Sequence, residues 1–452
     1  MSSWAWLWLG HGKRSKALHA EPHPCPIRPP RPRGLKMSSE KSSTENPMVY
    51  LFSSMLRIAI IGNGVVGQAI GAVLAAKVKR ARVTAYDPVK ASKPLGRVRR
   101  ADSLAAAVKG ASHIFICVPS YLKGKGIEGS AWGRLAKELD RCSALDAVIV
   151  IKSTLVPGDA ARLEALTNRR VVICPEFMAE GTAERDILKP HRVLVGGKDK
   201  NAVKSVIRIY RHWVPENRII RMDTWSAQLT KLFANAMLAQ RVSSINSMVA
   251  LCELGDGDIH AVSKAAGMDP RIGSMYLQPS VGFGGSCLEK DLRLLCALAE
   301  CMGLPSVARY WRSVISQNDE QVRRVTRQIS KMAGKGGRVA VLGLAFKPRV
   351  ADVRNSAPLR IAEGLAELGH PLVAHDPKVK AVKGVRMAST PSVAVRDAAV
   401  VVVLNDEPVY RALDWRRIAR TAAPGAKVYA CSSVIGRAAA AEMETTILGG
   451  IT

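Results

Sequence analysis

Arg57-Ile58-Ala59-Ile60-Ile61-Gly62-Asn63-Gly64-Val65-Val66-Gly67 is the stretch that decides the fold. An apolar strand runs here directly into the pattern G-x-G-x-x-G, and residues 68–78 follow with a helical pattern. The first glycine makes a tight turn, the second lets a pyrophosphate approach the backbone, and the third lets helix and strand pack closely. A second strand over 82–86 ends in Asp87, whose carboxylate should bind ribose hydroxyls. The stretch therefore predicts a dinucleotide-binding sheet that prefers NAD to NADP.

Further strands of the same sheet follow along the chain. Apolar runs over 113–118, 147–151 and 171–173 each end in a loop of polar or proline residues. Open α/β sheets bind ligands at the carboxyl ends of parallel strands, so these loops should complete the dinucleotide site. The residues expected to bind the dinucleotide are Gly62, Asn63, Gly64, Val65, Val66, Gly67, Asp87, Val118, Pro119, Ser120, Ser153 and Thr154.

The second half of the chain repeats this pattern after a helical region. An amphipathic helix is predicted over 226–254, and helical patterns continue over 257–335. Strands are then expected over 338–347, 371–374, 399–404 and 427–430, the last being the final strand. We therefore predict an α/β protein with two Rossmann-like, doubly wound parallel-sheet domains, joined by a long central helix and a helical dimerisation domain.

Changes in composition mark the expected domain limits. Residues 1–54 hold a tryptophan cluster and a Pro/Arg tract without a strand–helix pattern, which indicates a disordered extension or a start codon placed too early. The NAD-binding domain is expected over 55–223, and the central helical domain over 224–335. Residues 336–452 should bind the nucleotide part of a substrate, because their glycine signature is degraded.

A second glycine-rich loop, Val281-Gly282-Phe283-Gly284-Gly285-Ser286-Cys287, runs into a helical pattern. Ser286 is predicted to be the N-cap of this helix, and Glu289 three residues later would complete a capping box. Cys287 would then lie on the first helical turn, which should lower the pKa of its thiol and make it a nucleophile. Asp291 can face the same cavity at a spacing of four residues. The alternative is a buried cysteine with a packing role only.

Two further pairs of polar residues share a spacing of four. Glu176 and Glu180 follow a strand beside proline and glycine, where a role in the site is more plausible than solvated surface. Lys231 and Asn235 share one face of the long helix, where they could form a surface pair or stabilise a developing oxyanion. Both pairs are therefore candidate site residues.

Composition limits the classes of function. The net charge of +30 at pH 7 suits anionic substrates, but the basic residues are spread along the chain, and aromatic residues make up only 5%. We therefore expect no specific nucleic-acid partner. No apolar run is long enough for a membrane helix, so no membrane association is expected. The cysteine count is odd, at 9, without a C-x-x-C pair, which favours a reducing, cytoplasmic location and argues against a metal site.

The spaced motifs together resemble those of the UDP-glucose dehydrogenase family, the nucleotide-sugar 6-dehydrogenases, over nearly all of 55–435. The motifs that carry the resemblance are Gly62-x-Gly64-x-x-Gly67, Pro175-Glu176-Phe177-Met178-Ala179-Glu180-Gly181-Thr182-Ala183, Lys231-x-x-x-Asn235, Gly282-Phe283-Gly284-Gly285-Ser286-Cys287 and Ala345-Phe346-Lys347 with Asp352-Val353-Arg354.

The resemblance implies that the sugar C6 alcohol of UDP-glucose is oxidised twice, with NAD as cofactor, to UDP-glucuronate. It assigns Cys287 as the covalent nucleophile, Asp291 and Glu176 as general-base candidates, and Lys231 and Asn235 as oxyanion stabilisers. Thr154 would position water, and Glu180 and Arg354 would contact NAD. Arg271 would reach the substrate across the interface of a homodimer or of a higher assembly of dimers. Substrate contacts are implied for Glu176, Phe177, Met178, Ala179, Glu180, Lys231, Asn235, Arg271, Tyr276, Gln278, Gly282, Phe283, Gly284, Phe346 and Lys347.

Three alternatives remain open from the sequence. The same chemistry could act on another nucleotide sugar, such as GDP-mannose or a UDP-N-acetylhexosamine. A two-electron hydroxyacid-type dehydrogenase shares the first sheet and the helical middle but needs no cysteine. A basic binding protein on a retained scaffold would reduce no NAD and would bind nucleic acid in a salt-sensitive manner.

Overall fold

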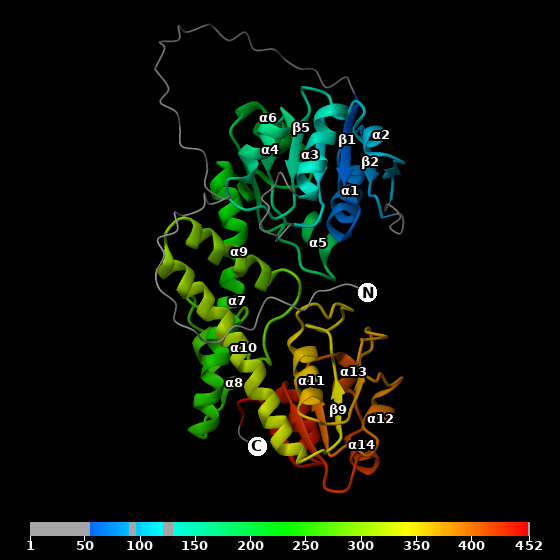
Figure 1. Ribbon diagram of the computed structural model, residues 1–452, viewed down its shortest axis with the longest axis vertical. Coiled ribbons are helices and arrows are strands. Elements are labelled where there is room, and N and C mark those ends of the chain that lie inside the picture. The colour runs from blue at the N-terminus through cyan, green and yellow to red at the C-terminus, as the bar shows by residue number, and fades with distance from the viewer. Residues whose placement is uncertain (1–54, 90–95, 121–129, 451–452) are drawn as a thin grey trace, which may run out of the picture.

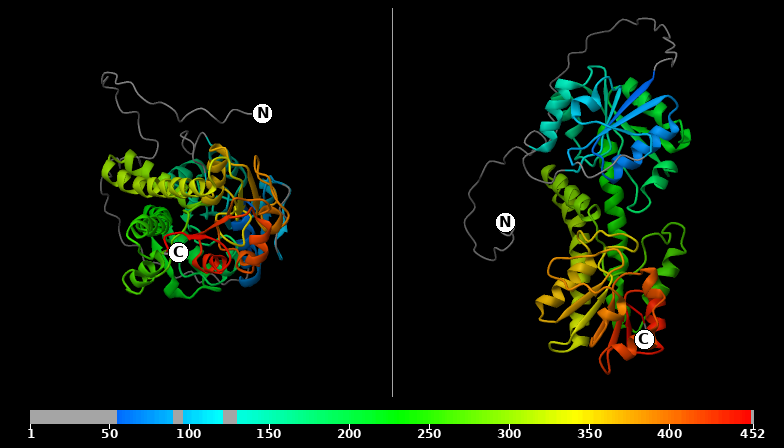
Figure 2. Two further views of the ribbon diagram at one scale, coloured as in Figure 1. Left: turned by 90° about the horizontal axis from the view of Figure 1, so that it is seen from below. Right: turned by 90° about the vertical axis from the view of Figure 1, so that its right-hand side faces the viewer.

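The structure is a computed structural model that describes residues 55–89, 96–120 and 130–450. The predicted extension over 1–54 lies outside the described residues. Two sheet domains lie at opposite ends of the longest axis, and the helices α7 (Thr224–Leu254) and α10 (Pro305–Ala333) run along one side between them (Figure 1). A view from the side shows the same separation of the two domains (Figure 2).

The N-terminal sheet has eight strands in the order β3-β2-β1-β4-β5-β6-β7-β8. All its neighbouring strands are parallel except β6 and β7. Its elements are β1 Leu56–Ile61, α1 Val65–Lys77, β2 Ala81–Tyr86, β3 Arg99–Arg100, α2 Leu104–Val108, β4 His113–Ile116, α3 Ala131–Cys142, β5 Val148–Ile151, α4 Asp159–Thr167, β6 Arg170–Ile173, α5 Ala183–Leu188, β7 Val193–Gly197, α6 Lys200–Tyr210, η1 Glu216–Arg218 and β8 Ile219–Met222.

The C-terminal sheet has five parallel strands in the order β10-β9-β11-β12-β13. Its elements are β9 Val339–Leu342, α11 Ala357–Glu367, β10 Leu372–His375, α12 Pro391–Ala394, β11 Val400–Val403, α13 Pro408–Arg411, α14 Trp415–Thr421, β12 Lys427–Ala430, α15 Ser433–Ala440 and β13 Thr445–Ile447. The predicted fold class of two Rossmann-like sheets is confirmed. The prediction of 427–430 as the final strand is wrong, because β13 follows it and pairs with β12.

Alternation of side chains along the strands gives each sheet two buried faces. Along β1, Ile58 and Ile60 belong to one core cluster, whereas Ala59 and Ile61 belong to the other. This pattern is expected for a parallel sheet that is covered by helices on both faces. The parallel strands thereby place their carboxyl ends, with the loops that follow, along one edge of each sheet.

The central region consists of α7, α8 (Ile259–Gly267), α9 (Leu288–Cys301) and α10. The helix α7 begins two residues before its predicted start, because the Asp223 carboxylate caps it by accepting a hydrogen bond of 2.8 Å from Ser226 N. An apolar cluster that includes Ala236, Leu292 and Val314 joins α7, α9 and α10. The cysteine loop is therefore attached to a rigid three-helix scaffold.

Candidate active site

The dinucleotide loop has the geometry that its glycines predict. Gly62 has φ +93°, and a Cβ there would lie 2.7 Å from the Cys117 carbonyl oxygen, so only glycine fits. A Cβ on Gly64 would meet nothing within 4 Å, which leaves the start of α1 open to a phosphate group. The Asp87 carboxylate accepts hydrogen bonds from Asn63 N (2.6 Å) and Val89 N (2.9 Å). These residues fit the diphosphate and ribose of NAD.

The loops after β4 and β5 lie side by side at the same edge of the sheet. The Ser153 hydroxyl donates to the Val118 carbonyl at 2.5 Å, and the Pro119 carbonyl accepts from Trp132 Nε1 at 3.1 Å. The structure thus brings the expected dinucleotide residues Val118, Pro119 and Ser153 to the edge where β1 ends. Ser120 and Thr154 follow directly in these loops and are partly buried.

Cys287 lies at the N-terminus of α9, and its side chain is exposed. The prediction of Ser286 as the N-cap is wrong, because Cys287 itself is the N-cap and no side chain caps the helix. The capping box is absent as well: the Glu289 carboxylate accepts from Arg293 Nε at 2.8 Å. The Gly285 N–H donates to the Arg354 carbonyl at 3.0 Å, so a contact with the C-terminal domain fixes the loop beside the helix.

Asp291 is fully buried one turn after Cys287. One of its carboxylate oxygens accepts from Asn235 Nδ2 at 2.5 Å, and the other accepts from Lys290 Nζ at 2.6 Å. The first bond joins α9 to α7, so two residues that were predicted separately, Asp291 and Asn235, meet in the structure. A buried carboxylate held by two donors is a fixed acceptor close to the thiol.

Lys231 projects from α7 into the same group of charges. Burial lowers the pKa of Lys231 below its usual value, although the acidic groups of Asp291, Glu176 and Cys287 act to raise it. Lys290 lowers it further. The Lys231 ammonium also lies 5.1 Å from the centre of the Phe177 ring. Lys231 is therefore a partly desolvated cation that is near both carboxylates and the thiol.

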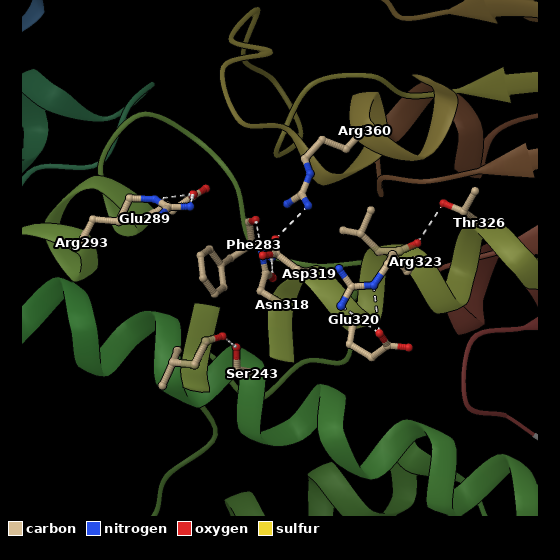
Figure 3. Close-up of polar contacts among 12 residues, drawn as sticks. Ser243, Phe283, Glu289, Arg293, Asn318, Asp319, Glu320, Arg323, Thr326 and Arg360 are labelled. Carbon is tan, nitrogen blue, oxygen red and sulfur yellow. Dashed lines mark hydrogen bonds and ion pairs between the residues drawn. The ribbon is translucent and has the colours of Figure 1, made fainter. Parts of the chain in front are cut away.

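The glycine-rich loop is pinned to α10 by one buried amide. Asn318 accepts from Phe283 N at 2.8 Å and donates to the Phe283 carbonyl at 3.1 Å (Figure 3). Asn318 is only 2% exposed. Gly284 packs so closely against the C-terminal domain that an added Cβ would lie 2.5 Å from the Asn355 carbonyl oxygen. The loop that carries Cys287 is therefore held from two sides.

We expect Asn318→Ala to lower the free energy of unfolding by about 2 kcal/mol, because two buried backbone groups of Phe283 lose their partner. It should also reduce kcat by displacing the loop before Cys287. Urea denaturation and initial rates measure the two effects. Ser243→Ala is the matched control. It removes a different buried hydrogen bond, of 2.8 Å, from the Ser243 hydroxyl on α7 to the Val314 carbonyl on α10. An unchanged stability of Asn318→Ala would contradict the anchoring role.

The two sheet domains meet at Glu180. The Lys347 ammonium donates to the Glu180 carbonyl at 2.7 Å, and the Glu180 carboxyl is hydrogen-bonded to Asp352. Burial raises the pKa of Glu180, and the Asp352 carboxylate raises it further. The hydrogen bonds from Arg354 are the largest of the causes that lower the pKa of Asp352. Glu180, Lys347 and Arg354 are thus brought together.

Other predicted substrate residues do not join this group within the chain. Arg271 has a side chain that is 88% exposed and forms an ion pair with Asp269 at 2.6 Å. Tyr276, at φ +62°, and Gln278 are exposed on the same segment. The role of Arg271 across a dimer interface therefore stays a prediction.

Three models of one family match the chain. They are described as the NAD binding domain over 87–214, the central domain over 225–320 and the UDP binding domain over 340–436 of the UDP-glucose/GDP-mannose dehydrogenase family. UDP-glucose 6-dehydrogenase 1 of Oryza sativa subsp. japonica is 35% identical over 434 residues, which are 80% of this chain and 90% of the relative. The chain belongs to the UDP-glucose/GDP-mannose dehydrogenase family. Its expected cofactor, NAD, is confirmed by the described function of the first family domain.

Other relatives agree with this family. UDP-glucose 6-dehydrogenase of Bos taurus is 40% identical over 332 residues, covering 68% of this chain and 67% of the relative. The solved UDP-glucose dehydrogenase of Pyrobaculum islandicum superposes with a TM-score of 0.77 at 26% identity, over 88% of this chain and 99% of that chain. A UDP-D-ManNAc dehydrogenase of Pyrococcus horikoshii, at 21% identity and a TM-score of 0.75, shares the fold over 88% of this chain and 100% of its own.

Within residues 55–89, 96–120 and 130–450, no cluster of His, Cys, Asp and Glu could hold a metal ion. No helix in these ranges is both long and apolar enough to cross a bilayer. The free thiols among the described cysteines are Cys117, Cys142, Cys174, Cys252, Cys287, Cys296 and Cys431.

Sequence reasoning gave no role to three residues that support the site. Lys152 forms an ion pair with Glu176, Asp352 faces Glu180, and Asn318 holds the cysteine loop. Asn318 could have been found as a polar residue at one of the otherwise apolar, buried positions of α10. Lys152 also directly follows a buried strand, where a charged residue needs a partner.

Proposed function

We propose that this protein is an NAD-dependent UDP-glucose 6-dehydrogenase that forms UDP-glucuronate by a four-electron oxidation of the sugar C6. The observation that carries the proposal is the exposed Cys287 at a helix N-terminus, next to buried Asp291 and Asn235 and the partly desolvated Lys231. Relatives that are 35% and 40% identical to this chain are named UDP-glucose 6-dehydrogenases, which supports UDP-glucose over GDP-mannose or a UDP-N-acetylhexosamine. A hydroxyacid-type dehydrogenase would have no use for this cysteine.

The first half of the reaction needs a charge-stabilising site. NAD⁺, when bound, accepts the hydride that each of the two oxidations releases. In the first oxidation, a carboxylate accepts the proton of the C6 hydroxyl, with Asp291 and Glu176 as the candidates, and the Lys231 ammonium and the Asn235 amide stabilise the oxygen. The Cys287 thiolate then adds to the aldehyde carbon and forms a C–S bond. This covalent thiohemiacetal keeps the aldehyde on the protein while the cofactor is exchanged.

The second half releases the acid. Oxidation of the thiohemiacetal leaves a thioester on Cys287, whose carbonyl oxygen faces the same Lys231 and Asn235 donors. Water adds to the thioester, a carboxylate accepts its proton, and the C–S bond breaks to return the thiolate. Asp291 and Glu176 are the candidate acceptors, and Thr154 is assigned to orient the water. Glu180 and Arg354 would contact the cofactor, and Phe346 and Lys347 the nucleotide sugar.

The stoichiometry of NADH tests this proposal. We expect two NADH for each UDP-glucose consumed, with UDP-glucuronate as the product identified by mass spectrometry. One NADH for each sugar would contradict the thioester route, because the reaction would then stop at the aldehyde. Turnover of GDP-mannose or a UDP-N-acetylhexosamine with a higher kcat/KM than UDP-glucose would favour the alternative substrates.

The assembly and the location are also part of the proposal. Exposed apolar side chains occupy one face of α7, at Phe233, Met237, Met248 and Leu251. We assign this face to the contact of a homodimer, from which a higher assembly of dimers could be built. The proposed domain limits remain 55–223, 224–335 and 336–452. The free thiols favour the cytoplasm.

A further inference from the structure

One lysine is buried beneath the site, and the proposed reaction makes no use of it. Lys152 follows β5 at the carboxyl edge of the sheet and is only 5% exposed. Its ammonium lies 3.3 Å from the Tyr210 hydroxyl, 3.4 Å from the Pro175 carbonyl oxygen and 3.9 Å from Cys174 Sγ. Two of these groups, on Cys174 and Pro175, directly precede Glu176 in the chain.

The charge of Lys152 is balanced by Glu176. The ammonium nitrogen is 3.6 Å from Glu176 Oε2. Burial alone would lower the pKa of Lys152, but neighbouring Cys174, Tyr210 and Glu176 outweigh it and raise the value. Burial also raises the pKa of both the Cys174 thiol and the Tyr210 hydroxyl. The carboxylate that faces the buried cation is that of Glu176.

The Glu176 carboxylate is consequently held from two directions. Its Oε1 accepts a hydrogen bond from Met178 N, and its Oε2 faces Lys152. The charge of Glu176 also acts to raise the pKa of Lys231 on α7. The carboxylate thus interacts with a buried cation of the sheet and also with the partly desolvated cation that is assigned to the reacting oxygen.

Stability alone gives no reason for a lysine at position 152. Removing an ammonium ion from water costs several kcal/mol, and a buried ion pair seldom recovers more than this cost. The neighbours of Lys152 include Cys174 and Tyr210, which belong to an apolar core cluster, so an apolar side chain of similar length would be accommodated without the desolvation cost. The retained charge points to a task at the site.

We propose that Lys152 is a positioning residue, whose buried ammonium holds the Glu176 carboxylate in the orientation that the water step requires. The inference rests on the proposed function, because it assigns Lys152 to the step in which the thioester on Cys287 is released. Lys152 touches neither substrate nor cofactor in this role. Its whole effect on the rate passes through Glu176.

A double-mutant cycle tests this dependence. Lys152→Met should lower kcat by about 30-fold with little change in KM, because a misplaced carboxylate loses its alignment with water. The same substitution in a Glu176→Gln background should change kcat by less than about twofold, because the group that Lys152 orients is gone. Purely structural damage would instead lower kcat by similar factors in both backgrounds.

Two further variants guard the interpretation. Lys152→Gln keeps hydrogen-bond donors but lacks the charge, so it should fold where Lys152→Met fails and lose about tenfold in kcat by the same argument. Arg169→Met is the matched control. Arg169 is also 5% exposed, precedes β6, and donates to the Thr167 and Ser143 carbonyls at 2.9 Å and 2.7 Å, far from Glu176. Its loss should lower Tm but leave kcat unchanged.

The natural chain tests the proposed function, and the variants test the role of Lys152. A natural chain that yields no NADH from any nucleotide sugar overturns the proposed function. An active natural chain overturns the inference on Lys152 if the folded Lys152→Met or Lys152→Gln variant keeps kcat within twofold. The inference is also overturned if Lys152→Met lowers kcat by equal factors in the natural and the Glu176→Gln backgrounds. Loss that disappears in the Glu176→Gln background supports it.

Discussion

A Cys287→Ser variant is expected to lose steady-state formation of NADH from UDP-glucose by on the order of 10⁴-fold or more, as is typical when a covalent nucleophile is removed. The thiol is exposed at the start of α9, where backbone N–H groups stabilise a thiolate. A serine hydroxyl at the same place stays protonated at neutral pH, so it adds poorly to an aldehyde. Steady-state rates and the yield of NADH for each sugar measure the loss.

The control for this prediction is a cysteine outside the site. Cys142 lies on α3 and bonds to the Glu138 carbonyl within its own helix, so Cys142→Ser should keep the natural rate and stoichiometry. Mass spectrometry of the natural chain, stopped during turnover, should show an adduct on Cys287 that the serine variant lacks. Full turnover by Cys287→Ser would remove the covalent step from the mechanism and favour a two-electron dehydrogenase.

Local patterns were sufficient to predict the parts of the fold that depend on neighbours in the sequence. The glycine loop after β1 and the acid at the end of β2 follow from backbone sterics and from strand alternation, and the structure places both as expected. The strands β7 and β8 were not predicted from the sequence. The antiparallel pairing of β7 with β6 depends on how the chain returns after α5, which no periodicity records.

The start of α9 shows where local reasoning fails. Ser286 and Glu289 have the spacing of a capping box, but Glu289 pairs with Arg293 instead. The backbone of Gly285 bonds to Arg354, which is distant in the sequence, and this tertiary contact overrides the local preference. Asn318 and Lys152 were missed for a related reason. Their partners are remote in the sequence, so their roles are visible only once the elements are packed.

The site residues divide in the same way, into those that local patterns predict and those that depend on contacts with remote residues or other subunits. Asp291 and Asn235 were predicted from helical spacing and from the family resemblance, and they meet because α7 packs against α9. Arg271 was predicted to reach the substrate across a dimer interface. Within a single chain, its exposed side chain forms an ion pair with Asp269. A sequence can therefore suggest which residues share a face of a helix. It cannot supply the contacts between subunits.

Lys231→Met is expected to lower kcat by about 10²- to 10³-fold, the usual cost of removing a donor from a developing oxyanion. The Lys231 ammonium is desolvated and lies near Asp291, Glu176 and Cys287, so its charge acts with little screening by water. Initial rates at saturating UDP-glucose and NAD⁺ measure the effect. Lys264→Met, at an exposed position on α8, is the control and should retain the natural kcat.

The pH dependence of kcat decides in which form Lys231 acts. Burial lowers the pKa of Lys231 below that of an ordinary lysine. If the ammonium stabilises the oxygen, kcat is full below this lowered pKa and falls as the pH rises through it. If the neutral amine instead removes a proton, kcat rises over the same interval. We expect the fall, and we expect Lys231→Met to lose this alkaline limb. A rising limb in the natural chain, absent from the variant, would assign Lys231 as a base and leave the oxyanion to Asn235.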